Sequence, residues 1–142
     1  MTFFVDANVV LYAASRGEYR GPSLAILGAI AGGDAEGQTS VAVIEEVWHI
    51  ERSGRAGPLD GLAEHAHSLF APVLAVTDEV IHTALGLHAG DLGTNDRVHA
   101  ATCIVNGISV IVTADRGFDA VPALRRIDPL DERALAPLLG GP

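Results

Sequence analysis

The chain has 142 residues, 49% of them hydrophobic, and carries eighteen acidic residues against nine basic residues, all arginine, for a formal net charge of −9. This balance argues against non-specific binding to nucleic acid, which depends on neutralising phosphates, and favours cations or basic partners. A single cysteine excludes an internal disulfide, and no apolar run approaches the ~20 residues of a membrane span, so we expect a reduced, cytoplasmic protein.

The first half of the chain opens with a predicted buried strand. The apolar run from Phe3 to Val5 stops on Asp6, which places a carboxylate at the carboxyl end of that strand. Apolar spacing and breaker residues then predict a helix over 7–14, a loop over 17–22, a helix over 23–31, a turn over 32–37, a brief strand over 38–40, a helix over 41–53 capped by Ser40, and a helix over 59–70.

The second half alternates in the same way. It contains an extended piece over 73–76, a helix from Thr77 to about Gly90, a helix over 95–106 capped by Thr94, a strand over 108–112, an edge strand over 124–127 and a weak helix after Pro129. Strands separated by helices imply parallel pairing. We therefore expect one α/β domain over 1–142, a three-layer sandwich with a central parallel sheet of four to five strands.

Four carboxylates point to one edge of this sheet. Asp115 follows the strand over 108–112 as Asp6 follows the first strand, and two buried like charges at neighbouring strand ends require a proton or a cation between them. Glu46 lies on a largely apolar helix face, and Asp96 lies in the first turn of its helix. Simpler roles are a helix N-cap for Asp6, a buried ion pair with an arginine for Glu46, and dipole pairing for Asp96.

Four motifs occur in a characteristic order: D-x-N at 6–8, S-x-x-x-x-E-E at 40–46, N-D-R-V-H-A-A at 95–101 and V-T-A-D-R-G-F at 112–118. Together they resemble the motifs of the PIN-domain ribonucleases. Within that group the chain looks most like the small VapC-type toxins of type II toxin–antitoxin systems. The resemblance extends from Thr2 to about Ile127 and implies a parallel sheet, an acidic metal site and endonucleolytic cleavage of RNA.

Carried over residue by residue, the resemblance implies that Mg²⁺, or Mn²⁺ in its place, is held by the acids Asp6, Glu46, Asp96 and Asp115. Asn8 and Thr113 match accessory polar positions. A metal-bound water would attack the phosphorus, while a second metal or Arg116 would stabilise the charge on the leaving side. Glu45 remains an alternative to Glu46, Asp119 to Asp115, and Asp91 a weaker one to Asp96. His99, three residues after Asp96, could touch the site.

The resemblance also implies a cognate antitoxin, with a basic segment that lies across the acidic toxin. We expect the chain to form a homodimer or a toxin–antitoxin hetero-oligomer. Trp48, which we expect in the core, could instead anchor such a partner. Two other functions stay open: a catalytically silent scaffold whose acidic pocket binds a protein, and a small metal-dependent phosphohydrolase. The second typically needs an acid two residues after Asp6, where this chain has Asn8.

Overall fold

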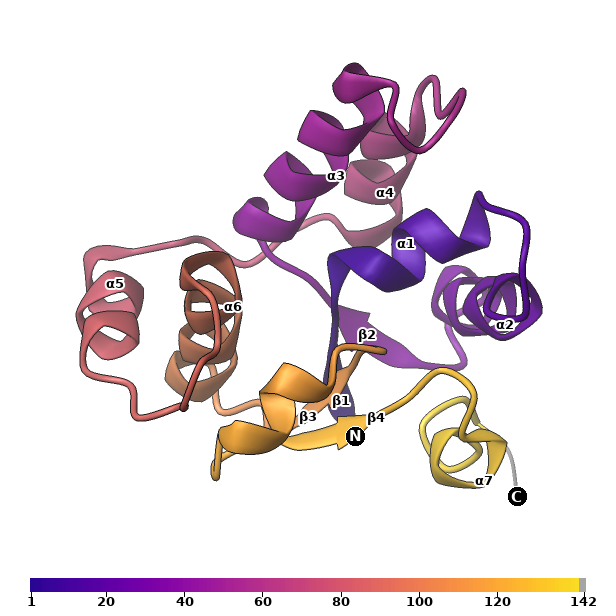
Figure 1. The fold of residues 1–142 in the computed structure, drawn as a ribbon. Coiled ribbons are helices and arrows are strands. Elements are labelled where there is room, and N and C mark those ends of the chain that lie inside the picture. Colours follow the sequence, from indigo (N-terminus) through magenta and orange to yellow (C-terminus); the bar gives the residue numbers. More distant parts are fainter. Residues whose placement is uncertain (141–142) are drawn as a thin grey trace.

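The computed structural model describes residues 1–140 and contains a parallel sheet of strand order β2-β1-β3-β4 (Figure 1). The strands are β1 (Thr2–Val5), β2 (Glu36–Gln38), β3 (Val110–Val112) and β4 (Arg125–Ile127). β1 pairs with both β2 and β3, and its residues Phe3 to Val5 are fully buried. The predicted α/β fold is confirmed, with four strands in the described part of the chain.

The helices form three contacting pairs around the sheet. They are α1 (Ala7–Ala13) with α2 (Arg20–Ala31), α3 (Val41–Ser53) with α4 (Leu62–Phe70), and α5 (Asp78–Leu85) with α6 (Thr94–Val105); a 3₁₀ helix η1 (Arg116–Ala120) and a short α7 (Glu132–Leu135) follow. In Figure 1 the sheet lies between the α5–α6 pair and the α1–α2 pair, which gives the expected layers. Among residues 1–140, every helix is too short or too polar to cross a membrane.

The strand order reverses between β1 and β3. The chain leaves β1 through α1 and α2 to form β2 on one side, and later adds β3 and then β4 on the other side. The backbone N–H of Asp6 donates to the Val112 carbonyl at 3.2 Å, so the carboxyl ends of β1 and β3 are neighbours. A crevice at this switch point is where open α/β sheets bind ligands.

Several predicted boundaries differ from those in the structure. The second strand ends at Gln38, because Thr39 and Val41 exchange backbone hydrogen bonds with Leu74 instead of continuing along β1. The extended piece over 73–76 therefore forms only an isolated bridge between Ser40 and Leu74. The N-cap of α6 is Gly93, and Thr94 is already helical.

Helix α2 begins at Arg20, inside the predicted loop over 17–22. Pro22 lies in its first turn, where the missing N–H costs no hydrogen bond, so proline there does not exclude a helix. Helix α3 has the predicted bounds and buries Val43 and Val47. Trp48, expected in the core, is 54% exposed on the opposite side of this helix.

The N-terminus of α3 should depend on Ser40, whose Oγ accepts a hydrogen bond from the Val43 N–H at 3.2 Å. We expect Ser40→Ala to lower the free energy of unfolding by about 1 kcal/mol, because a cap at a buried helix start is lost. Ser53→Ala, at the exposed end of the same helix, is the matched control and should change it by less than about 0.5 kcal/mol. Urea denaturation monitored by circular dichroism measures both, and equal effects would show that the cap does not stabilise α3.

Candidate metal centre

Asp6 is held in place by the sheet and by the helix that follows it. The residue is 3% exposed, and its Oδ1 accepts a hydrogen bond from the Ala7 N–H at 2.7 Å, so Asp6 is also the N-cap of α1. Its Oδ2 accepts from the Thr113 hydroxyl at 2.7 Å. The capping role considered from the sequence is therefore real, and it fixes the carboxylate at the strand end.

Asn8 and Thr113 connect the ends of β1 and β3 around this carboxylate. The Asn8 side-chain amide donates to the Thr113 Oγ1 at 2.8 Å and to the Asp6 Oδ2 at 3.3 Å. The Asp115 N–H donates to the same Thr113 hydroxyl at 3.1 Å. Asn8 and Thr113 thus orient Asp6 and the backbone that carries Asp115.

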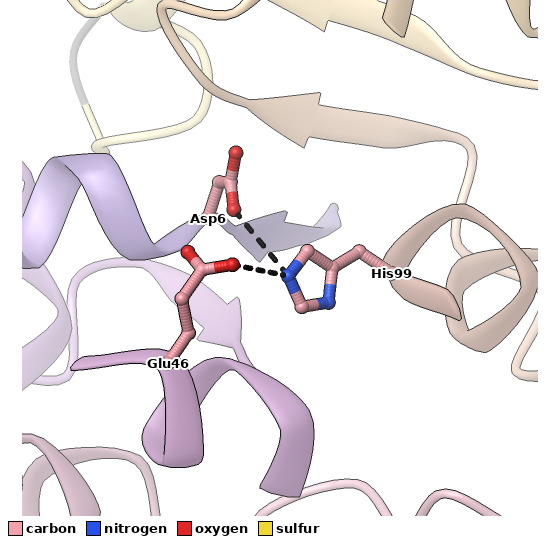
Figure 2. A group of neighbouring side chains, drawn as sticks. All are labelled: Asp6, Glu46 and His99. Atoms are coloured by element: carbon pink, nitrogen blue, oxygen red, sulfur yellow. Dashed lines mark ion pairs between the residues drawn. The ribbon is translucent and has the colours of Figure 1, made fainter. Parts of the chain in front are cut away.

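Glu46 and His99 reach Asp6 from two different helices. Helix α3 contacts both α1 and α6, and this packing brings Glu46 beside the buried ring of His99. The Nε2 of His99 lies 3.5 Å from the Glu46 Oε1 and 3.9 Å from the Asp6 Oδ1 (Figure 2). Glu45, the alternative to Glu46, is exposed. The structure therefore brings Asp6, Glu46 and His99 together.

Asp96 and Asp115 form the other side of the acidic cluster. Burial, the charge of Asp6 and a shared hydrogen bond with Asp115 raise the pKa of Asp96 to about 7. The Asp115 Oδ1 also accepts from the Gly117 N–H at 2.8 Å, which caps η1 and orients the side chain. Two carboxylates that share a hydrogen bond must retain a proton or take up a cation.

Asp6 and His99 have perturbed pKa values. Burial raises the pKa of Asp6, against the opposing effects of His99 and the hydrogen bonds from Thr113 and Ala7. Burial lowers the pKa of His99, but its contact with Glu46 and the charges of Asp6 and Asp96 outweigh burial and leave that pKa above its usual value. The site therefore contains several carboxylates and one buried imidazole.

The acids open onto two hollows in the surface. One hollow of about 520 Å³ is lined by Asp96 and Asp115, together with Asp91, Arg116 and Gly117. A second of about 420 Å³ is lined by Glu46, with Glu45, His49 and Asn95. Asp6 is buried and is not among the residues that line either hollow.

Other predicted residues lie at the margin. Arg116 is exposed and lines the larger hollow, as does Asp91. Asp119 lines it too, but its carboxylate is paired with the Arg126 guanidinium, with Nε to Oδ1 at 2.9 Å. Arg126 also donates to the Thr113 carbonyl at 3.2 Å, so this pair supports the loop that carries Asp115.

The donor set suits a divalent cation. Asp6, Glu46 and His99 each offer a ligand atom within 4.8 Å of the others, and neither ring nitrogen of His99 has a hydrogen-bond partner among residues 1–140. Clustered carboxylates and an imidazole without a hydrogen-bond partner are ligands that proteins provide to divalent metal ions. Sequence reasoning weighed His99 only as a side candidate; its signal is the i, i+3 spacing from Asp96 on one helix.

The sequence profile of the PIN domain matches residues 3–124, and the chain belongs to the PIN domain family. No curated protein matches it. The fold is similar to that of VapBC2 from Rickettsia felis bound to a promoter DNA fragment (16% identity, 90% of this chain and 98% of that chain, TM-score 0.68). It is also similar to FitAcB from Neisseria gonorrhoeae (20% identity, 91% of this chain and 99% of that chain, TM-score 0.65). A third similar structure is PAE2754 from Pyrobaculum aerophilum (24% identity, 97% of this chain and 98% of that chain, TM-score 0.58).

Asp96 should make the metal-free protein less stable as the pH rises. Its pKa is about 7 in the folded state and 3.8 as the ordinary value, so the folded state binds the proton more tightly and stability falls between about pH 4 and pH 7. We expect Asp96→Asn to remove that decline in the presence of EDTA. After allowance for solvent screening, its free energy of unfolding at pH 7 should exceed that of the original chain by about 1–2 kcal/mol. Denaturant titrations at pH 4.5 and 7.5 measure this free energy. The same pH dependence in both proteins would show that Asp96 does not cause the loss of stability.

Proposed function

We propose that this protein is a metal-dependent endoribonuclease that acts as the toxin of a toxin–antitoxin pair, in a single PIN domain over 1–142 in the cytoplasm. The observation that carries the proposal is the group of carboxylates next to the carboxyl end of β1: Asp6 lies beside Glu46 and His99, and burial, the charge of Asp6 and the neighbouring Asp115 raise the pKa of Asp96. Membership of the PIN domain family supports a nuclease. The similarity to the toxin–antitoxin complex of Klebsiella pneumoniae supports the toxin role (15% identity, 89% of this chain and 96% of that chain, TM-score 0.65).

In this proposal the four acids hold a divalent cation, either Mg²⁺ or Mn²⁺. The bound metal supplies an activated water and positive charge for the phosphoryl oxygens. Asp6 is kept in position by Asn8 and Thr113, so its carboxylate does not need to reorganise during the reaction. These residues lie at strand and helix ends rather than on free loops, which favours a fixed geometry.

Local arginines provide the contact with phosphate. The chain has a net charge of −9, so the surface as a whole repels RNA. Arg116 is exposed at the hollow lined by Asp96 and Asp115, and it is the best placed to contact a phosphate. Arg97, on α6, donates to the carbonyls of Leu87, Gly90 and Leu92 and fixes the loop before α6 instead.

The acidic surface also favours a basic protein partner, and a cognate antitoxin is the partner we propose. Trp48 on α3 is exposed beside a cavity of about 680 Å³ between α3 and α4. An exposed tryptophan next to a cavity is an apolar anchor of the kind that protein interfaces use. The same surface would serve a toxin homodimer.

The adjacent glutamates provide a matched test of the catalytic centre. Glu46→Gln should reduce RNA cleavage by at least about 100-fold, because a carboxylate next to Asp6 is lost, whereas Glu45→Gln should stay within about threefold of the original chain. Cleavage of total RNA is followed with Mg²⁺ or Mn²⁺ and with EDTA.

Full activity of Glu46→Gln, or cleavage that resists EDTA, would contradict the metal-dependent nuclease. Metal binding without cleavage of any RNA would favour the silent scaffold. Hydrolysis of nitrophenyl phosphate but not RNA would favour the phosphohydrolase.

A further inference from the structure

We infer that His99 is itself a metal ligand, and that Asp6, Glu46 and His99 form a mixed nitrogen–oxygen site that prefers Mn²⁺ to Mg²⁺. The inference deepens the proposed function and rests on its metal dependence. It adds a nitrogen donor to a centre otherwise built from carboxylates. It thereby specifies which class of divalent cation this chain selects.

The ring of His99 is completely buried, yet neither nitrogen has a hydrogen-bond partner among residues 1–140. Buried polar side chains are nearly always hydrogen-bonded, so an unpartnered ring needs an explanation. Figure 2 shows one ring nitrogen, Nε2, facing the carboxylates of Asp6 and Glu46. The imidazole therefore points into the site already described.

The two distances from the His99 ring to the carboxylates fit a shared ion. Donor atoms about 2.0–2.2 Å from one metal lie roughly 3–4.3 Å from each other. The Nε2 of His99 is 3.5 Å from the Glu46 Oε1 and 3.9 Å from the Asp6 Oδ1, both inside that range. Asp6 follows β1, whereas Glu46 lies on α3 and His99 on α6, so the fold brings together donors that are far apart in the sequence.

The ring is oriented by packing. The ring centroids of Phe4 and His99 are 6.1 Å apart, and the adjacent residues Ala100 and Ala101 are completely buried. A ring held in this way keeps Nε2 directed at the carboxylates without a hydrogen bond to Nδ1. The donor is therefore in place before any ion binds.

A nitrogen donor changes which ion is preferred. Mg²⁺ is hard and takes oxygen ligands and waters, whereas imidazole suits transition metals. The competing role for His99 is that of a hydrogen-bond donor that only orients Glu46. The two roles differ in whether a nitrogen is bonded to the ion.

Pulsed electron paramagnetic resonance of the Mn²⁺-loaded full chain distinguishes them. We expect a directly bonded nitrogen coupling in the original chain, a changed pattern after labelling with ¹⁵N-histidine, and no such coupling in His99→Gln. Calorimetric titration should show a loss of Mn²⁺ affinity of roughly tenfold or more in His99→Gln, with Mg²⁺ affinity within about threefold. His49→Gln, in the hollow beside Glu46, is the control and should keep the coupling.

The labelled original chain keeps the test decisive even if His99→Gln fails to fold. Mn²⁺ bound at one equivalent without a nitrogen coupling overturns the inference, as does failure to bind Mn²⁺ or loss of the coupling in His49→Gln alone. RNA cleavage by a protein that lacks the coupling overturns only this inference. A nitrogen coupling in a protein that cleaves no RNA leaves the inference standing and overturns the proposed function.

Discussion

The constraint on which the site depends is the fixed position of the Asp6 carboxylate. It stands at the end of the central, fully buried strand and accepts hydrogen bonds from Ala7 and Thr113, so it cannot turn toward solvent. Every carboxylate brought near it adds unfavourable charge. Burial, together with the neighbouring Asp6 and Asp115 carboxyls, raises the pKa of Asp96 to about 7. A cation relieves this repulsion, which is why a metal is the occupant the arrangement favours.

The rest of the fold delivers groups to that fixed point. Ser40 caps the start of α3, the helix that places Glu46 beside Asp6. Asp96 and His99 lie on one side of α6 and approach Asp6 from that helix. Thr113 closes the gap between the ends of β1 and β3. Because donors come from separate elements, the geometry forms only in the folded chain, and metal binding should be coupled to folding.

Much of this could be predicted from the sequence, because strand ends and helix faces are encoded locally. The apolar run that stops on Asp6 and the apolar face around Glu46 both carried that information. The position of Trp48 could not be predicted, since its exposure depends on which side of α3 the helices α1, α4 and α6 cover. Nor could the pairing of Asp119 with Arg126, because it joins η1 to β4 through the tertiary fold. His99 was undervalued because a buried imidazole is identified by its neighbours, and these are Asp6 after β1 and Glu46 on α3.

The most direct test of the account is thermal unfolding of the original chain and of Asp6→Asn, with and without Mn²⁺ or Mg²⁺. The account predicts that metal raises the melting temperature of the original chain, with a stabilisation of about 2.7 kcal/mol when the free ion is at 100 times its Kd. Asp6→Asn should fold, because asparagine can still cap α1, but should lose most of that metal response. An unchanged melting temperature of the original chain in millimolar Mn²⁺ and Mg²⁺ would contradict a metal centre at Asp6.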